Sequence, residues 1–188
     1  MGIIYIILIL LCISTGMFAI GVVSGSKLGS CYKTSAVFKT AGVFIVANLM
    51  ALSLGFVLGR LMLDALEAQA VLLVFCFLFL IGVRLLMESI EKSPSLNHTD
   101  ILQNVYLIKV AAQASIDSLM FGFALAMAAD KFLLVALFFS AMFNFGMVVF
   151  GFSHGHAANK TVLGNRMQLV AAVVILVLAV RFLIVASN

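Results

Sequence analysis

Charged residues are scarce in this sequence. Only 10% of its 188 residues are Asp, Glu, Lys or Arg, whereas 65% are apolar. Soluble domains carry roughly 25% charged and 45–50% apolar residues. A chain with so few charges lacks the polar side chains that would cover a soluble fold of this size. The composition therefore predicts an integral membrane protein.

The motifs that mark common enzyme classes are also absent. The sequence contains no nucleophile elbow, HExxH motif or Walker loop. Its three cysteines are an odd number, and their spacing fits no zinc site, so we expect reduced thiols. We predict neither an enzyme nor a covalently bound cofactor.

Six apolar runs lie between the few charges. Each is about 20 residues long, the length of a membrane-spanning helix. A transmembrane barrel would need alternating strands of about 10 residues, and stretches such as VLLVFCFLFLIGV do not alternate. The sequence thus predicts an all-α fold with spans at 3–23, 41–59, 69–87, 106–128, 132–152 and 167–185.

The net charge of +4 does not indicate a nucleic-acid site, because most of the basic residues lie in the loops between spans, where they set the orientation of the protein in the membrane. No basic stripe with interleaved aromatic residues is present. Only Arg60 and Lys131 follow the second and fourth spans. Since basic loops stay in the cytoplasm, we predict that both termini lie outside it. The basic residues on the predicted cytoplasmic side are Lys27, Lys33, Lys39, Lys92, Lys160 and Arg166.

The two halves of the chain share a pattern of residues. A polar connector at 91–105, which contains the only proline, separates a half at 1–90 from a half at 106–188. Residues of the first half recur in the second half at nearly constant spacing. Three pairs are 96 positions apart (144 − 48, 151 − 55, 155 − 59): Asn48 and Asn144, Gly55 and Gly151, and Gly59 and Gly155. The stretches VRLL and VRFL are 97 apart (180 − 83), and two pairs are 101 apart (115 − 14, 122 − 21): Ser14 and Ser115, and Gly21 and Gly122.

This pattern predicts a duplicated unit of three helices. Because three is odd, the second unit would enter the membrane from the opposite side, giving two inverted repeats. That architecture is typical of transporters, whose sites lie near the bilayer midplane between the repeats. The alternative is that glycines recur because small residues let helices pack closely.

One acid lies inside an apolar span. Asp117 is at the centre of 106–128, where a carboxylate costs about 2.5–3.5 kcal/mol on insertion scales. It therefore needs a polar or hydrated partner, and Gln113 lies four residues earlier on the same helix face. Asn48 and Asn144 also lie near the centres of their spans.

Carboxylate and amide oxygens suit hard divalent cations such as manganese or magnesium. The sequence therefore predicts a cation site formed by Asp117, Asn48, Asn144 and Gln113. The alternative for the two asparagines is hydrogen bonding between helices, worth about 0.6 kcal/mol each.

Two further groups of polar residues have open interpretations. Arg84 and Glu88 are four residues apart and can pair along one helix face, either as a boundary ion pair or as a gate. His154 and His156, in the stretch SHGH, do not share a helix face. For them the sequence favours a solvated turn over a metal site.

Together these residues resemble the bacterial manganese efflux pump family, MntP, whose members have six helices in two three-helix repeats and belong to the lysine exporter superfamily. The resemblance is strongest in ASIDSLMFGFALA, around Asp117, and in GVRLLMES, which contains Arg84 and Glu88. It implies cation export from the bacterial inner membrane, with Mn²⁺ as the first candidate. Gly16, Asn48 and Gln168 replace acids of the family, which would weaken divalent binding unless carbonyls or waters replaced them.

Two functions stay open. In one, Asp117 binds an exported cation or carries a coupling proton, and a monovalent cation or a proton-coupled solute would fit the reduced charge better than a divalent cation. In the other, the chain is a non-transporting membrane subunit or scaffold. The expected partners are the bilayer, a cation substrate, and a membrane protein or second copy, but no nucleic acid. An Asp117 facing lipid, or bound to a basic side chain in a dry interior, would argue against ion passage.

Overall fold

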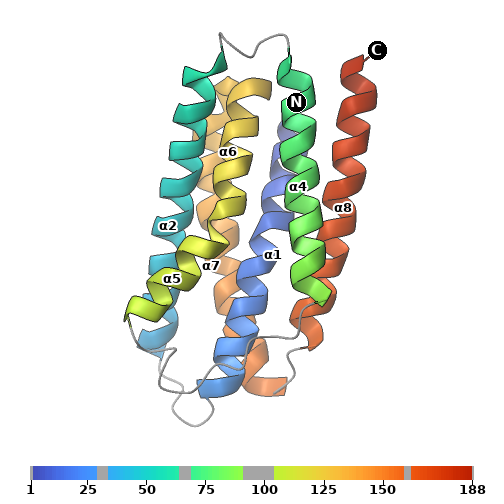
Figure 1. The fold of residues 1–188 in the computed structure, drawn as a ribbon. Helices are drawn as coiled ribbons and strands as arrows, with labels where there is room; N and C mark the ends of the chain where they lie inside the picture. Colours follow the sequence, from blue (N-terminus) through green and yellow to red (C-terminus); the bar gives the residue numbers. More distant parts are fainter. Residues whose placement is uncertain (1, 29–33, 64–68, 91–103, 159–161, 188) are drawn as a thin grey trace.

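A computed structural model of the chain describes residues 2–28, 34–63, 69–90, 104–158 and 162–187. These residues form a bundle of long helices (Figure 1), and the described ranges contain no strand. They include six segments long and apolar enough to cross a membrane, which confirms the predicted all-α fold with six spans. The helices are α1 (Ile3–Leu28), α2 (Thr34–Leu61), α4 (Ala70–Ile90), α5 (Asn104–Ala114), α6 (Ile116–Ala128), the 3-10 helix η3 (Asp130–Phe132), α7 (Leu133–Ala158) and α8 (Val162–Ser187).

Apolar side chains occupy both the inside and the outside of this bundle. Phe18, Phe44 and Phe121 are fully buried between helices, whereas Ile4 and Leu134 are 70% and 80% exposed. Apolar surface of this extent is unfavourable in water but not in hydrocarbon. Long helices also satisfy their backbone hydrogen bonds internally, which a lipid environment requires. The exposed apolar faces are therefore the ones that would meet lipid.

The closest helix pairs join the two halves of the chain. α1 packs most extensively against α7, α2 against α6, and α4 against α8. Gly21 of α1 lies against the carbonyl of Val148 in α7, and Gly122 of α6 lies against the carbonyl of Leu52 in α2. The two contacts are related by the offsets found in the sequence (122 − 21 = 101, 148 − 52 = 96). This pairing is consistent with two inverted repeats, which stay a prediction.

The fourth span differs from the single helix that we expected at 106–128. It is interrupted at Ser115, and α5 turns away from the axis of α6 (Figure 1). The Ser115 Oγ donates to the carbonyl of Ala111 at 2.7 Å, and the Ser115 amide is shared between the carbonyls of Ala111 and Ala112. Back-bonding of this kind bends helices.

The prediction of a solvated turn at His154 was wrong. His154 lies in α7, and its Nδ1 atom is 3.2 Å from the carbonyl oxygen of Phe150. Ser153 bonds in the same way to the carbonyl of Val149 at 3.0 Å. These polar side chains bond back to the preceding turn, so the helix continues beyond the apolar run. The side chain of His156 lies outside the described part of the chain.

Candidate cation site

Asp117 lies in the first turn of α6, directly after the interruption at Ser115. Only 4% of the residue is exposed. Its Oδ1 atom lies 3.0 Å from Nη1 of Arg84, which belongs to α4 in the other half of the chain. The positive end of the α6 dipole also favours a negative charge at this position. The carboxylate is therefore bound to a guanidinium inside the protein.

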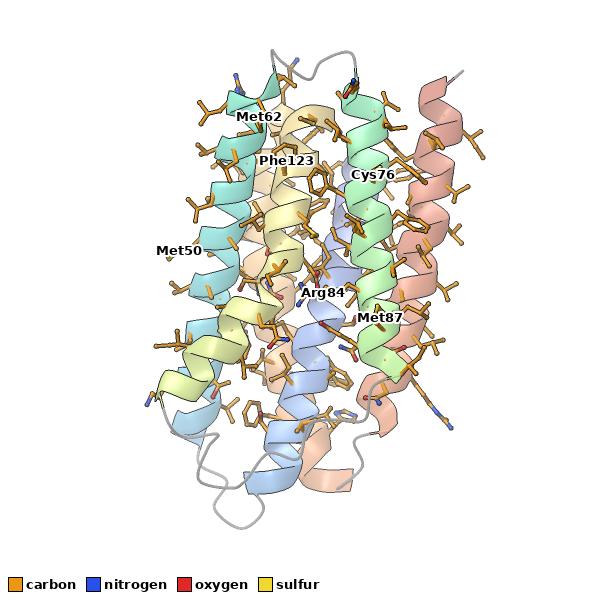
Figure 2. The ribbon with its side chains drawn as sticks, viewed as in Figure 1. Met50, Met62, Cys76, Arg84, Met87 and Phe123 are labelled. Carbon is orange, nitrogen blue, oxygen red and sulfur yellow. The ribbon has the colours of Figure 1, made fainter. Side chains whose placement is uncertain are left out.

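Arg84 uses all three of its guanidinium nitrogens. Besides the contact with Asp117, Nη2 donates to the backbone carbonyl of Gln113 at 2.7 Å. Nε lies 3.2 Å from Oε1 of Glu88, one turn later in α4. Figure 2 places Arg84 between α4 and α6, at the level where α5 meets α6. The predicted pair of Arg84 and Glu88 is thus present, and Asp117 shares the same guanidinium.

Glu88 is also approached from α8. Gln168 of α8 is buried, and its Nε2 atom lies 3.5 Å from Oε2 of Glu88. A Cβ atom on Gly16 of α1 would lie 3.9 Å from the same Nε2 atom. Of the positions at which the family resemblance implies acids, Gln168 therefore lies beside the group formed by Asp117, Arg84 and Glu88, and Gly16 lies next to Gln168.

Asn48 joins this group on the α2 side. It is fully buried, and its Oδ1 atom accepts a hydrogen bond from Ser118, the neighbour of Asp117 in sequence. Its Nδ2 atom is buried without a partner among the described residues. A buried polar atom without a partner is unfavourable, and water or a ligand can satisfy it.

Two predicted ligands are not brought to Asp117 in the expected way. Asn144 is buried in α7, where its Nδ2 donates to Ser140 at 3.2 Å, and its Oδ1 has no partner among the described residues. The Gln113 side chain is exposed, and only its carbonyl oxygen joins the group. The shared helix face predicted for Gln113 and Asp117 was wrong, because the helix is interrupted between them.

The group carries one net negative charge when its two carboxylates and one guanidinium are ionised. The side chains of Arg84 and Glu88 are 22% and 35% exposed, so protein does not fully enclose the group, although Asp117 itself is buried. No three His, Cys, Asp or Glu side chains gather as a metal site in the described ranges. A cation bound here would therefore need neutral oxygens in addition to Asp117 and Glu88.

Sequence reasoning missed two parts of this site, the contact of Arg84 with Asp117 and the hydrogen bond of Ser118. Arg84 and Asp117 are 33 positions apart, so periodicity along a single helix cannot relate them. The available signal was the presence of opposite charges within two predicted spans, because a buried charge requires a partner. For Ser118 the sequence offered only its position beside Asp117.

Comparisons with known proteins agree in pointing to one family. Residues 31–183 match the family model Mntp, described as "Putative manganese efflux pump". Two relatives from Dehalococcoides mccartyi, strains BAV1 and CBDB1, are each named "Putative manganese efflux pump MntP". Each is 29% identical over 139 residues, which cover 73% of this chain and 72% of the relative. No solved structure matches the chain. Because the family model spans most of the sequence, this chain belongs to the Mntp family.

Proposed function

We propose that this protein exports a cation, with Mn²⁺ as the first candidate, through the group around Asp117. The names of the family and of the relatives support metal efflux. The observation that carries the proposal is the position of Asp117, a buried carboxylate that lies where the two halves of the chain meet within membrane spans. Transporters with inverted repeats bind their substrates at such an interface. The contact with Arg84 alone would argue against ion passage, but the side chains of Arg84 and Glu88 are 22% and 35% exposed, so the group is not sealed in the interior.

The charge of the group favours a cation that displaces Arg84. With Arg84 in place, a bound divalent ion would leave one excess positive charge, whereas the two carboxylates alone would balance that ion. Asp117 and Glu88 would then supply charged oxygens. The amides of Asn48 and Gln168 would supply neutral ones after rotating, because Ser118 occupies the Asn48 Oδ1 and Gln168 turns its Nε2 toward Glu88. Such a set suits hard divalent cations. A monovalent cation, by contrast, would be balanced with Arg84 still bound.

Growth in the presence of toxic Mn²⁺ tests the proposal. In a bacterial host that lacks its own manganese exporter, the wild-type protein should restore growth and lower the cellular manganese content. Asp117→Asn should lose this effect, because it keeps the shape of the side chain and removes its charge. Ser153→Ala, at an exposed position of α7, is the control and should behave as wild type. Unchanged tolerance with Asp117→Asn at equal expression would exclude Asp117 from transport.

A non-transporting role as a membrane subunit is the second candidate. It is favoured by the pairing of Asp117 with Arg84 and by the lack of a three-ligand metal cluster among the described residues. Under this alternative, the purified protein would bring a stoichiometric membrane partner with it and would carry no Mn²⁺ into lipid vesicles. Mn²⁺ flux into vesicles that contain only this protein would reject the alternative.

A further inference from the structure

Arg84 links the two segments on either side of the interruption in the fourth span. Its Nη2 atom binds the carbonyl of Gln113, in the last turn of α5, and its Nη1 atom binds Asp117, in the first turn of α6. The guanidinium is planar and rigid. It therefore fixes the position of α5 relative to α6, and a change at Asp117 is transmitted to α5.

The first half of the chain contains the same serine without an interruption. Ser14 in α1 corresponds to Ser115 (115 − 14 = 101), and its Oγ bonds to the carbonyl four residues earlier at 2.9 Å, yet α1 is continuous. The carbonyl that corresponds to that of Gln113 is the one of Cys12 (113 − 12 = 101), and it accepts a local bond from Thr15 at 2.7 Å. The serine alone thus does not interrupt the helix. What distinguishes the second half is the arginine on the Gln113 carbonyl.

α5 packs against fewer helices than α6 does. It packs chiefly against α2, whereas α6 packs against both α2 and α4. Ile108 is 58% exposed, and Ala112 and Gln113 are exposed as well. Segments with few buried contacts open locally at a low free-energy cost. The contact with Arg84 therefore acts on this segment together with the packing of the buried Ala111.

We propose that Arg84 is a latch, and that a cation binding to Asp117 displaces Arg84 and releases α5 to pivot at Ser115. The cation and the guanidinium compete for the same carboxylate oxygen, and two positive charges a few ångströms apart repel strongly in a low dielectric. Once Nη1 leaves Asp117, Nη2 leaves the Gln113 carbonyl with it. The coupling is reciprocal, so release of α5 also raises the affinity for the cation. This inference rests on the proposed function for the presence of a cation at Asp117.

Hydrogen exchange measured by mass spectrometry on the purified protein in lipid nanodiscs tests the latch. In the wild type, Mn²⁺ should accelerate amide exchange in 104–114 and leave 3–13, the corresponding part of α1, unchanged. Arg84→Gln should exchange rapidly in 104–114 without Mn²⁺, on the order of tenfold faster than wild type, as expected for the loss of a hydrogen bond to a charged group. Mn²⁺ should add nothing further to the exchange of that variant.

Two more variants keep the test decisive. Arg84→Gln leaves a buried carboxylate unpaired and can prevent folding, so the double variant Arg84→Gln/Asp117→Asn removes both charges and should also exchange rapidly in 104–114. Arg181→Gln is the matched control. It makes the same change at an arginine of α8 that lies over the ring of Tyr5, 5.4 Å from its centroid, so exchange in 104–114 should stay slow.

The outcomes separate the latch from the proposed function. Slow exchange of 104–114 in the variants that lack Arg84 overturns the latch, whether or not the protein transports Mn²⁺. Mn²⁺ flux without faster exchange in the wild type overturns the coupling and leaves the proposed function intact. Rapid exchange in these variants, with no Mn²⁺ binding to the wild type, supports the latch and overturns Mn²⁺ as the displacing ion.

Discussion

Gly16 of α1 lies opposite Gln168 of α8, whose Nε2 atom is 3.5 Å from Oε2 of Glu88. A Cβ atom on Gly16 would lie 3.9 Å from Nε2 of Gln168, and no other described heavy atom outside the helix would come within 4 Å. The buried glycines of the described helices lie tightly against neighbouring helices, as Gly21 does against Val148, whereas Gly16 is only partly buried. Gly16 therefore does not serve close helix packing, and its position has room for a side chain.

Gly16→Asp should bind Mn²⁺ about tenfold more tightly than wild type, which corresponds to about 1.4 kcal/mol. The new carboxylate would stand next to Gln168 and raise the number of charged ligands, which sets divalent affinity. A Cβ atom fits at this position, but an added carboxylate within a span should lower thermal stability without Mn²⁺, and bound Mn²⁺ should recover it. Isothermal titration of the purified protein with Mn²⁺ measures the affinity. Gly16→Asn adds a side chain of the same size without charge, and equal affinities of the two variants would place Gly16 outside the site.

Gly21→Ala and Gly122→Ala should each destabilise the protein by about 1–3 kcal/mol, the usual effect of overpacking. A Cβ at Gly21 would lie 2.8 Å from the carbonyl oxygen of Val148, and the backbone of Leu52 blocks Gly122 in the same way. Thermal unfolding in detergent measures the loss of stability. Because the two glycines occupy matching positions in the predicted repeats, both variants should lose a similar amount.

Gly146→Ala is the control for these two substitutions. A Cβ at Gly146 meets no heavy atom within 4 Å. Replacing glycine by alanine in a helix stabilises it by up to about 1 kcal/mol, so this variant should be as stable as wild type or slightly more stable. A similar loss for Gly146→Ala would show that close helix contact is not the cause.

The sequence could predict the spans because each is decided by local composition. Hydrophobic runs of the required length specify helices in a membrane whatever their neighbours are, and the fold follows from six of them. The interruption at Ser115 could not be read in this way. Ser14 occupies the corresponding position in a continuous helix, so the serine carries no local signal that separates the two cases.

The contacts of the site were predictable only in part. Arg84 and Glu88 lie on one helix, and the spacing of four residues indicated their pairing. The contacts of Arg84 with Asp117 and of Asn48 with Ser118 depend on how α4 and α2 pack against α6. Packing of this kind is set by small residues and side-chain fit at distant positions, which periodicity along one helix does not reveal.

Arg84→Gln should lower the stability of the protein by about 3–5 kcal/mol, because it leaves the buried carboxylate of Asp117 without its partner. Adding Asp117→Asn should recover most of the loss, since removing both charges of a buried pair is often close to neutral. Unfolding of the two single variants and the double variant gives a double-mutant cycle. Strictly additive losses would mean that the two side chains do not interact in the folded protein.

A C-terminal fusion to alkaline phosphatase should be active, and a C-terminal fusion to green fluorescent protein should be dark, because both termini are predicted outside the cytoplasm. α1 begins and α8 ends at one end of the bundle (Figure 1). At the opposite end α1 ends and α2 and α8 begin, and the basic residues Lys27, Lys39 and Arg166 belong to these helix ends. A fusion after Ile90 should give the reverse result. Glu88 lies in the last turn of α4 and is partly exposed, so under the predicted topology it would lie toward the cytoplasmic end of its span. A fluorescent C-terminal fusion would instead mean that the C-terminus lies in the cytoplasm and that Glu88 lies toward the outside. A cation would then first meet the site from the outside.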